Sequence, residues 1–205
     1  MTGARFAVSR ESDTAPTGKV ISIGSTALLA RSTSQIAKAE LGDEGYAIDE
    51  KGGNLFLVGG ETRGPINAVY ALLEEDLGCR WYSRFSQTIP NKPTLKFRPT
   101  KRSYVPQLEI RDPYYWEAFD GTWSLRNRTN SSAAPVPNEW GGNKAYALFV
   151  HTFSTLVPAD TYFKEHPEYF SEHDGKRDPG QLCVSNPDVV RIAADSVKLI
   201  LRGNP

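Results

Sequence analysis

The sequence predicts an α/β protein, and three observations lead to that fold class. A short strand rich in branched residues, a hairpin and an amphipathic helix follow one another between residues 19 and 77. A proline-rich stretch at residues 86–106 then separates this half of the chain from the rest and is the candidate linker. The remaining half alternates strand-like and loop-like segments and ends in a helix, which is typical of the start of an α/β domain with parallel strands.

The first half opens with a predicted strand over residues 19–24, KVISIG, which a glycine ends. Residues 26–41 show helical spacing of apolar side chains in part, with interruptions by serine and threonine. Residues 45–50 and 55–60 predict two strands. Because the glycine-rich turn of residues 51–54 joins them, the segment as a whole predicts a hairpin.

The clearest helix of the sequence follows this hairpin. It begins near Pro65, since proline suits the first helical turn, where its missing N–H would have no partner. Gly78 stands where a helix-ending residue in the left-handed conformation is favoured, and residues 79–82, CRWY, predict a strand that leaves the helix. The apolar face of the helix consists of Ile66, Val69, Tyr70, Leu72, Leu73 and Leu77.

The second half ends in a helix with a well-marked start. Ser185 and Asn186 provide capping side chains, Pro187 suits the first turn, and Asp188 places a negative charge near the positive end of the helix. The elements predicted before it are a strand at 107–111, a loop at 112–142, a strand at 145–150, a short helical piece at 158–170 and a strand at 181–184.

Charge and composition argue against several functional classes. Lys plus Arg and Asp plus Glu both total 24, so no net charge draws the chain to nucleic acid or to an anionic surface. No stretch approaches the roughly 20 apolar residues of a membrane helix. Neither G-x-G-x-x-G nor P-loop spacing occurs, and His166, Glu168 and His173 lack the spacing of a metal site, so we expect no cofactor and no metal. Cys79 and Cys183 are expected to be separate thiols rather than a disulfide.

Two groups of motifs resemble known families. The motifs GGETRG at 59–64, AVY at 68–70 and LGCRWY at 77–82 resemble the N-terminal α+β domain of family 67 alpha-glucuronidases and the similar domain of hexosaminidase-like glycosidases. Within residues 151–190, the motifs HTF, HPEYF, DGKR and QLCVSNP resemble a bacterial domain-of-unknown-function family that follows such a domain. Together the two resemblances cover most of the chain from about Val20 onward.

The resemblance implies a domain organisation. Residues 1–99 would be the α+β accessory domain without its first strand and helix, and residues 100–205 would be the first βα units of an incomplete (β/α)8-type barrel. The chain would then be truncated at both ends. The start, MTGARF, has no signal-peptide pattern and predicts a cytoplasmic protein if it is genuine, whereas a full-length relative is expected to be exported or periplasmic.

Arg111 is the first candidate site residue, because barrel enzymes place their chemistry at strand ends. In the hexosaminidase-like group an arginine at the end of the first barrel strand holds sugar hydroxyls, and the resemblance puts Arg111 in that position. A guanidinium is a fork of donors that suits paired hydroxyls or a uronate carboxylate. The alternative is a structural arginine that pairs with Asp112 or Glu109.

Aromatic residues of the 112–142 loop are the second candidate, since flat apolar faces suit stacking on a sugar ring. The alternative is that these side chains anchor a long loop. The set consists of Trp116, Trp123, Trp140, Tyr114 and Tyr115.

Arg126 and Asn127 lie in a polar, basic cluster that suits hydroxyls or a carboxylate, with a solvated loop as the alternative. His151 would close the predicted strand at 145–150 and hydrogen-bond a substrate hydroxyl, with a satisfied structural histidine as the alternative.

The sequence therefore predicts a fragment of a glycoside-hydrolase-like protein that acts on polysaccharide, with carbohydrate as its partner and no activity as this chain alone. The alternatives are a non-catalytic carbohydrate-binding module and a gene fragment without function. A glycosidase needs a carboxyl pair or else a substrate-assisted arrangement. No convincing pair stands at the predicted strand ends, and the resemblance implies that those carboxylates lie beyond Pro205, so no catalytic residue is assigned.

Overall fold

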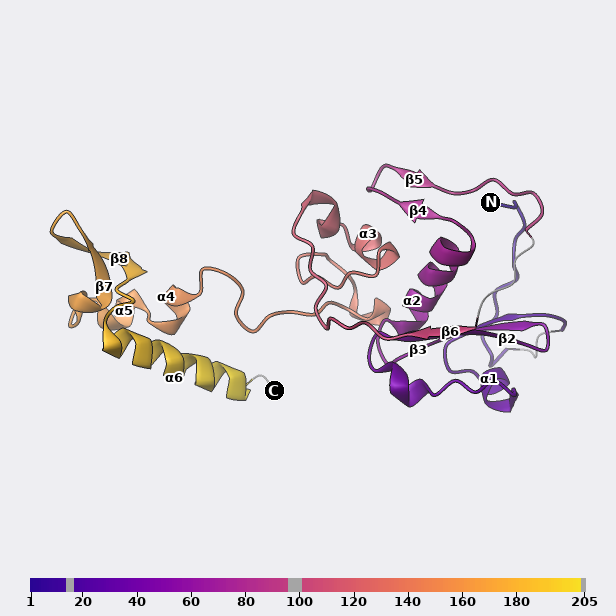
Figure 1. Cartoon of the computed structure of the whole chain (residues 1–205), viewed down its shortest axis with the longest axis horizontal. Coiled ribbons are helices and arrows are strands. Elements are labelled where there is room, and N and C mark those ends of the chain that lie inside the picture. Colours follow the sequence, from indigo (N-terminus) through magenta and orange to yellow (C-terminus); the bar gives the residue numbers. More distant parts are fainter. Residues whose placement is uncertain (14–16, 96–100, 204–205) are drawn as a thin grey trace. The chain divides into compact units, whose positions relative to one another are not determined.

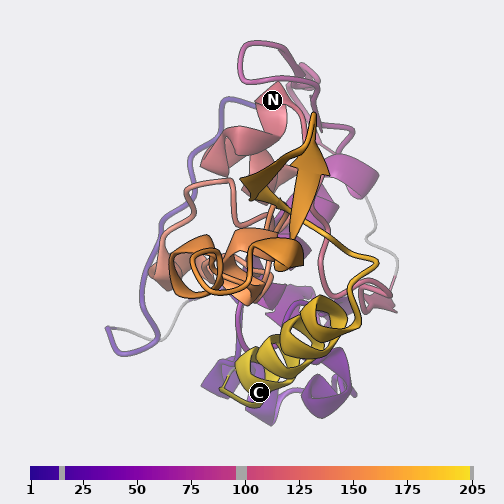
Figure 2. The same cartoon turned by 90° about the vertical axis from the view of Figure 1, so that its left-hand side faces the viewer.

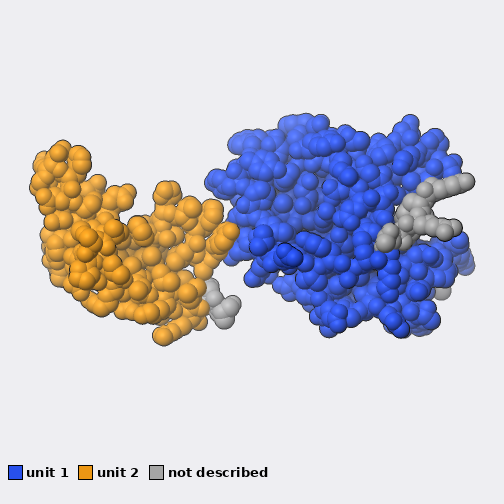
Figure 3. Space-filling model, in the orientation of Figure 1, with its two compact units in different colours: residues 1–145 blue, residues 146–205 orange. Residues whose placement is uncertain are grey.

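The computed structural model describes residues 1–13, 17–95 and 101–203, which form two compact units, 1–145 and 146–205 (Figures 1 and 3). The α/β class is confirmed in its coarse form, because helices and three small sheets are both present. None of the sheets in the described residues closes into a barrel. The barrel start and the domain boundary at residue 99 stay predictions.

A four-stranded sheet is the centre of unit 1, in the order β1-β3-β2-β6. Strands β2 and β3 form the predicted hairpin, antiparallel with Ile48 opposite Leu57. β1 runs parallel to β3, and β6 runs antiparallel to β2. The proline-rich stretch is therefore not a free linker throughout, because its end pairs with the sheet. The strands are β1 (Ile21–Ile23), β2 (Tyr46–Lys51), β3 (Asn54–Gly59) and β6 (Arg102–Tyr104).

Helical segments cover both faces of this sheet (Figure 1). On one face the predicted helix forms as α2 (Gly64–Ala71) and continues in a π-helical turn, η2 (Leu72–Asp76). Its Ala68, Ala71 and Leu72 pack on Tyr46, Ile48, Leu55 and Leu57. On the other face, α1 (Ala27–Arg31) and the 3-10 helix η1 (Lys38–Leu41) pack on Ala47, Phe56 and Val58. Alternate residues of each strand thus face opposite sides, as a pleated strand requires.

The GGETRG motif brings two backbones into contact. A Cβ atom on Gly59 would overlap the backbone of Gly64, and one on Gly64 would overlap Gly59 in turn. The end of β3 therefore lies against the first turn of α2, at a distance that only glycine allows. These glycines serve close packing, in agreement with the absence of a phosphate-binding spacing.

The described residues between 80 and 145, namely 80–95 and 101–145, form mostly turns and short elements. The predicted strand at 79–82 forms as β4, which pairs with β5 in a short hairpin. Gly78 has a φ of +79°, the left-handed conformation expected after a helix. The elements are β4 (Arg80–Trp81), β5 (Gln87–Thr88), η3 (Trp116–Phe119), α3 (Gly121–Arg126) and η4 (Asn138–Trp140).

The predicted strand at 107–111 does not form. Instead, the buried residue Asn130 pairs with backbone polar groups of Glu109 and Arg111. Asn130 Oδ1 accepts a hydrogen bond from Arg111 N at 2.7 Å, and Asn130 Nδ2 donates to Glu109 O at 2.8 Å. Asn130 N also donates to Arg111 O at 3.1 Å. An amide side chain carries both a donor and an acceptor, so it takes the place of a neighbouring strand here.

The predicted strand at 145–150 does not form either. Val150 and His151 have φ angles of +38° and +50°, which an extended strand excludes. His151 therefore does not close a strand; it lies exposed in the turn before α4.

Unit 2 is a small α/β assembly of its own (Figure 2). We expected parallel strands here, but the two strands in its described residues, β7 and β8, form an antiparallel hairpin. Asp174 and Gly175, both with positive φ, make the two-residue turn, for which Asp-Gly is a favoured pair. The final helix forms as predicted and packs on Leu156, Val157, Tyr169 and Phe170 through Val189 and its neighbours. The elements are α4 (Phe153–Leu156), α5 (Ala159–Tyr162), η5 (Pro167–Tyr169), β7 (Phe170–His173), β8 (Lys176–Leu182) and α6 (Pro187–Gly203).

Candidate functional site

Unit 1 carries four exposed aromatic side chains around a half-buried one, Phe119, and we call this set the aromatic surface: Phe85, Tyr114, Tyr115, Trp116 and Phe119. Phe85, Tyr114 and Trp116 are 88%, 71% and 70% exposed. Burying a large aromatic side chain is favourable, so leaving several of them in water stabilises nothing by itself. Such a surface indicates an interaction site.

The β4–β5 hairpin holds Phe85 at its tip. Ser83 Oγ accepts hydrogen bonds from the backbone N–H groups of Phe85 at 3.1 Å and Ser86 at 3.0 Å, which fixes the turn. The guanidinium carbon of Arg84 lies 5.1 Å from the ring centroid of Phe85 and 5.9 Å from that of Trp116. Arg84 thus joins two segments of the aromatic surface by cation–π contacts.

The 3-10 helix η3 presents Trp116 to solvent while its Ala118 is fully buried. The rings of Trp116 and Tyr114 both lie beside Phe119, with centroids 6.5 Å and 5.2 Å from it in edge-to-face geometry. Ala118 therefore anchors the turn, and the aromatic rings around it support one another on the outside.

Trp123 has a different position from Trp116. The Asp120 side chain caps α3 by accepting from Trp123 N at 2.7 Å, and the Trp123 ring is buried with Tyr115 against its edge at 5.5 Å. Trp140 lies elsewhere, on η4. The three tryptophans therefore do not form one floor: Trp116 is exposed, Trp123 is part of the core, and Trp140 lines a cavity described below.

Arg126 and Asn127 both contact Trp81. The guanidinium carbon of Arg126 lies 5.9 Å from the Trp81 ring centroid, while Asn127 Nδ2 donates to Trp81 O at 3.3 Å and to Trp123 O at 3.0 Å. Asn127 thereby ties the end of α3 to β4. Arg126 has no carboxylate partner among the described residues, so its guanidinium group is available to a ligand.

Arg111 is engaged on all three of its nitrogens. Nε donates to Arg128 O and Nη1 to Leu108 O, each at 2.9 Å, and Nη2 pairs with the carboxylate of Glu44. The ion-pair partner is therefore neither Asp112 nor Glu109, the two partners considered from the sequence. The partner, Glu44, lies in the loop before β2 and is 67 residues from Arg111 in the sequence.

Glu44 is the centre of a buried polar cluster, which consists of Glu44, Arg63, Arg111 and Asn130. Glu44 is 6% exposed, and Asn130 Nδ2 donates to both of its carboxylate oxygens, at 3.1 and 3.2 Å. Arg63 is 1% exposed and donates to Thr129 O. Burial lowers the pKa of the Arg63 guanidinium, and the charge of Glu44 opposes that shift. The cluster joins α2 and the β2 loop to residues 108–130.

A cavity of about 230 Å³, lined by both apolar and charged residues, lies beside this cluster. Its lining includes Asp43, Glu44, Glu109, Arg111 and Lys144. The Lys144 Nζ atom lies 2.9 Å from the carboxylate of Asp43 and 3.5 Å from that of Glu109. The hydrogen bond to Asp43 raises the pKa of Lys144, so the ammonium group stays charged here.

His151 lies in unit 2, and the other predicted site residues lie in unit 1. His166, directly before η5, pairs with Glu168 at 3.0 Å and stacks on Tyr169. No group of three or more metal-ligating side chains occurs in the described part of the chain. None of the helices described is both long and apolar enough to cross a bilayer.

Sequence reasoning missed Arg84, Phe85 and Glu44, and it missed the pairing of Asn130 with Glu44. The pair Arg84-Phe85, which follows the predicted strand at 79–82 after one residue, was a usable signal, because an aromatic residue at a hairpin tip has little to pack on. The pairing of Glu44 with Asn130 carried no signal, since the two residues are distant in sequence.

Comparison with known proteins gives one match. A family model described as a domain of unknown function (DUF4838) matches residues 81–205, while no curated protein and no solved structure matches the chain. The expected likeness to a domain-of-unknown-function family is thereby supported, and the likeness to glycosidases stays a prediction. Because the match covers more than half of its length, the chain belongs to the DUF4838 family.

Proposed function

We propose that the chain binds carbohydrate and is the binding part of a glycoside-hydrolase-like protein that acts on polysaccharide. The observation that carries this proposal is the aromatic surface, above all Trp116 with 70% of its side chain exposed. A pyranose ring has an apolar C–H face and a polar hydroxyl edge. An exposed indole packs on the first, and flanking polar groups satisfy the second.

Arg84 provides such a flanking group. It lies between the rings of Phe85 and Trp116, and no carboxylate pairs with it among the described residues. A free guanidinium donates to hydroxyls or binds a carboxylate in a bidentate manner. Together with the resemblance to alpha-glucuronidases, this favours a polysaccharide that contains uronic acid.

Affinity electrophoresis of the whole chain tests the proposal, with glucuronoxylan and polygalacturonate as acidic polysaccharides and unsubstituted xylan as the neutral one. We expect retardation by at least one acidic polysaccharide. Trp116→Ala should weaken the binding at least about tenfold, because truncating a central aromatic contact removes much of the binding energy. Trp140→Ala is the matched control, since Trp140 is also partly exposed but lies outside the aromatic surface.

Two results would contradict the proposal. One is that no polysaccharide retards the chain. The other is that Trp116→Ala and Trp140→Ala weaken binding equally, which would point to general loss of structure rather than loss of a binding face.

Hydrolysis of a glycosidic bond is a second candidate function, and one observation favours it. The cavity of about 230 Å³ beside the polar cluster is lined by three acidic residues, Asp43, Glu44 and Glu109. Glycosidases act through carboxyl pairs. Glu44 is held by Arg111 and Asn130, so Asp43 and Glu109 are the free pair once a substrate displaces Lys144. Release of reducing ends by the chain, lost in both Asp43→Asn and Glu109→Gln, would support this function; activity that survives both would exclude the pair.

A further inference from the structure

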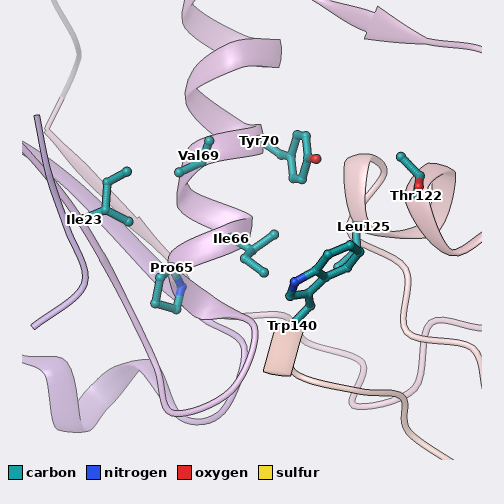
Figure 4. A pocket seen from close by; sticks show the side chains of 8 residues that line it. All are labelled: Ile23, Pro65, Ile66, Val69, Tyr70, Thr122, Leu125 and Trp140. Atoms are coloured by element: carbon teal, nitrogen blue, oxygen red, sulfur yellow. The ribbon is translucent and has the colours of Figure 1, made fainter. Parts of the chain in front are cut away.

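Unit 1 contains a cavity of about 360 Å³ that the carbohydrate proposal does not use (Figure 4). One wall is the face of α2 with Ile66, Val69 and Tyr70. The opposite side comes from α3, through Thr122 and Leu125, and from Trp140 on η4. The volume falls within the range of about 300–1,000 Å³ that small-molecule sites occupy.

The lining disfavours a sugar ring as the occupant. Apart from the hydroxyl groups of Tyr70 and Thr122 and the indole N–H of Trp140, the side chains that line it are apolar. A pyranose carries several hydroxyls, and most of them would lose water without gaining a partner, which costs free energy. An occupant with one polar group fits the lining better.

Two aromatic side chains project into the same space. Figure 4 shows the rings of Tyr70 and Trp140 directed into the cavity from different elements, with Ile66 between them. Aromatic rings favour offset or edge-to-face contacts with a further ring over contacts with an aliphatic group of equal size. The cavity therefore favours a planar aromatic occupant.

The polar groups lie where such a ring could use them. In Figure 4 the Tyr70 hydroxyl points toward Thr122. Neither hydroxyl has a hydrogen-bond partner within the described part of the chain. Two free hydroxyl groups across an apolar cavity suit one oxygen atom on the occupant, which can accept from one of them and donate to the other.

The Trp140 wall is held in place. Gly141, with a φ of +92°, lies so close to the buried Arg63 that a Cβ atom there would overlap the Arg63 side chain. Gly141 N also donates to Asn138 O at 2.9 Å, and Gly142 N donates to Pro137 O at 3.0 Å. The backbone that carries the indole is thus positioned before any ligand binds, which lowers the entropic cost of binding.

We propose that this cavity binds an aromatic ring that carries a hydroxyl group, that is, a phenolic group. The site is separate from the aromatic surface and does not depend on carbohydrate binding. Its occupant is a small phenolic molecule or a phenolic substituent on a larger one.

NMR spectroscopy of the indole N–H groups tests this directly, because the chain has four tryptophans and Trp140→Phe identifies the signal of Trp140. Phenol is the probe, and cyclohexanol is its non-aromatic counterpart of similar size. We expect phenol to shift the Trp140 signal with a Kd in the millimolar range, as for a fragment-sized ligand. Cyclohexanol should bind at least about fivefold more weakly, because it lacks ring–ring contacts.

Thr122→Phe should abolish phenol binding, since an exposed residue at the cavity mouth then fills the cavity. The same change at exposed Thr155, in unit 2, is the control and should leave binding unchanged. Trp140→Ala, followed by ligand-observed NMR, should weaken binding at least about fivefold by removing one wall. This second variant keeps the test decisive if Thr122→Phe fails to fold.

The proposal is overturned if phenol leaves the Trp140 signal unmoved at about 50 mM, well above a millimolar Kd, or if cyclohexanol binds as tightly. Retained binding in Thr122→Phe or in Trp140→Ala also overturns it. Trp116→Ala separates this proposal from the carbohydrate proposal, because it should lose polysaccharide binding and keep phenol binding.

Discussion

The aromatic surface and the buried polar cluster lie in the same unit and use their side chains in opposite ways. Trp116 is 70% exposed and rests on Phe119 and Arg84, so one whole side of its ring faces water. In the polar cluster, Glu44 accepts from Arg111 and Asn130, and every nitrogen of Arg111 has a protein acceptor. Both regions contain a residue that the sequence predicts to bind sugar. The difference teaches that a side chain is available to a ligand when its neighbours leave its ring face or its hydrogen-bonding groups unoccupied. Residue type alone does not decide this.

Removing the charge of Glu44 should have the largest effect and tests whether the polar cluster is structural. Glu44→Gln leaves Arg63 and Arg111 without their buried carboxylate, and an uncompensated buried charge costs about 3–5 kcal/mol. We expect the free energy of unfolding, measured by urea denaturation, to fall by that amount. Glu61→Gln is the control, because Glu61 is exposed and its pair with Lys38 contributes little. A loss below about 1 kcal/mol for Glu44→Gln would free Arg111 for a ligand-binding role.

The ion pair of Lys144 should have a smaller effect, which depends on pH. The hydrogen bond to Asp43 raises the pKa of Lys144 in the folded chain above its ordinary value of 10.5. The stabilisation is therefore complete below about pH 10 and declines as pH rises through the raised pKa. For a partly exposed pair we expect less than about 1 kcal/mol.

The check is the difference in unfolding free energy between the unmodified chain and Lys144→Met, measured at about pH 7 and again at about pH 11. Tyrosine titration contributes equally to both proteins and cancels in this difference. A difference that grows at the higher pH would have the wrong sign for the assignment.

Trp116→Ala should have the smallest effect on stability and so completes the comparison. Its ring buries little, and surface substitutions usually change the free energy of unfolding by no more than about 0.5 kcal/mol. Trp123 is a buried tryptophan seven positions further along the chain. Trp123→Ala should lower the free energy of unfolding by about 3–5 kcal/mol, measured by urea denaturation as above. Equal losses for the two variants would mean that Trp116 packs in the core and would remove it as a binding residue.

Local patterns predict the fold where one segment contains the whole signal. The β2–β3 hairpin follows from alternation and a glycine turn, and α6 follows from its capping residues and apolar spacing. The segment at 107–111 has an equally good strand pattern, yet the side chain of Asn130 takes the place of a partner strand. No local pattern contains that information, because the two segments meet only in the folded chain.

The sequence predicts the chemistry of the candidate site, aromatic and basic side chains, but not which individual residues form it. The sequence indicates aromatic residues around 114–140 but does not distinguish Trp116 from Trp123. Which of the two tryptophans is buried depends on how their short helices are oriented. Ala118 anchors η3, which carries Trp116, and the Asp120 side chain caps α3, which carries Trp123. In the same way, the sequence places Arg111 beside candidate acids but does not reveal Glu44, which lies before a strand of the sheet.

The polar cluster also has an evolutionary consequence. The family match begins at residue 81, yet Arg111 and Asn130 depend on Glu44, which lies upstream of it. A recombination event that joined residues 81–205 to an unrelated leader would bury a cationic group without its counter-charge. We therefore expect relatives that keep an arginine at the position of Arg111 to keep an acid at the position of Glu44.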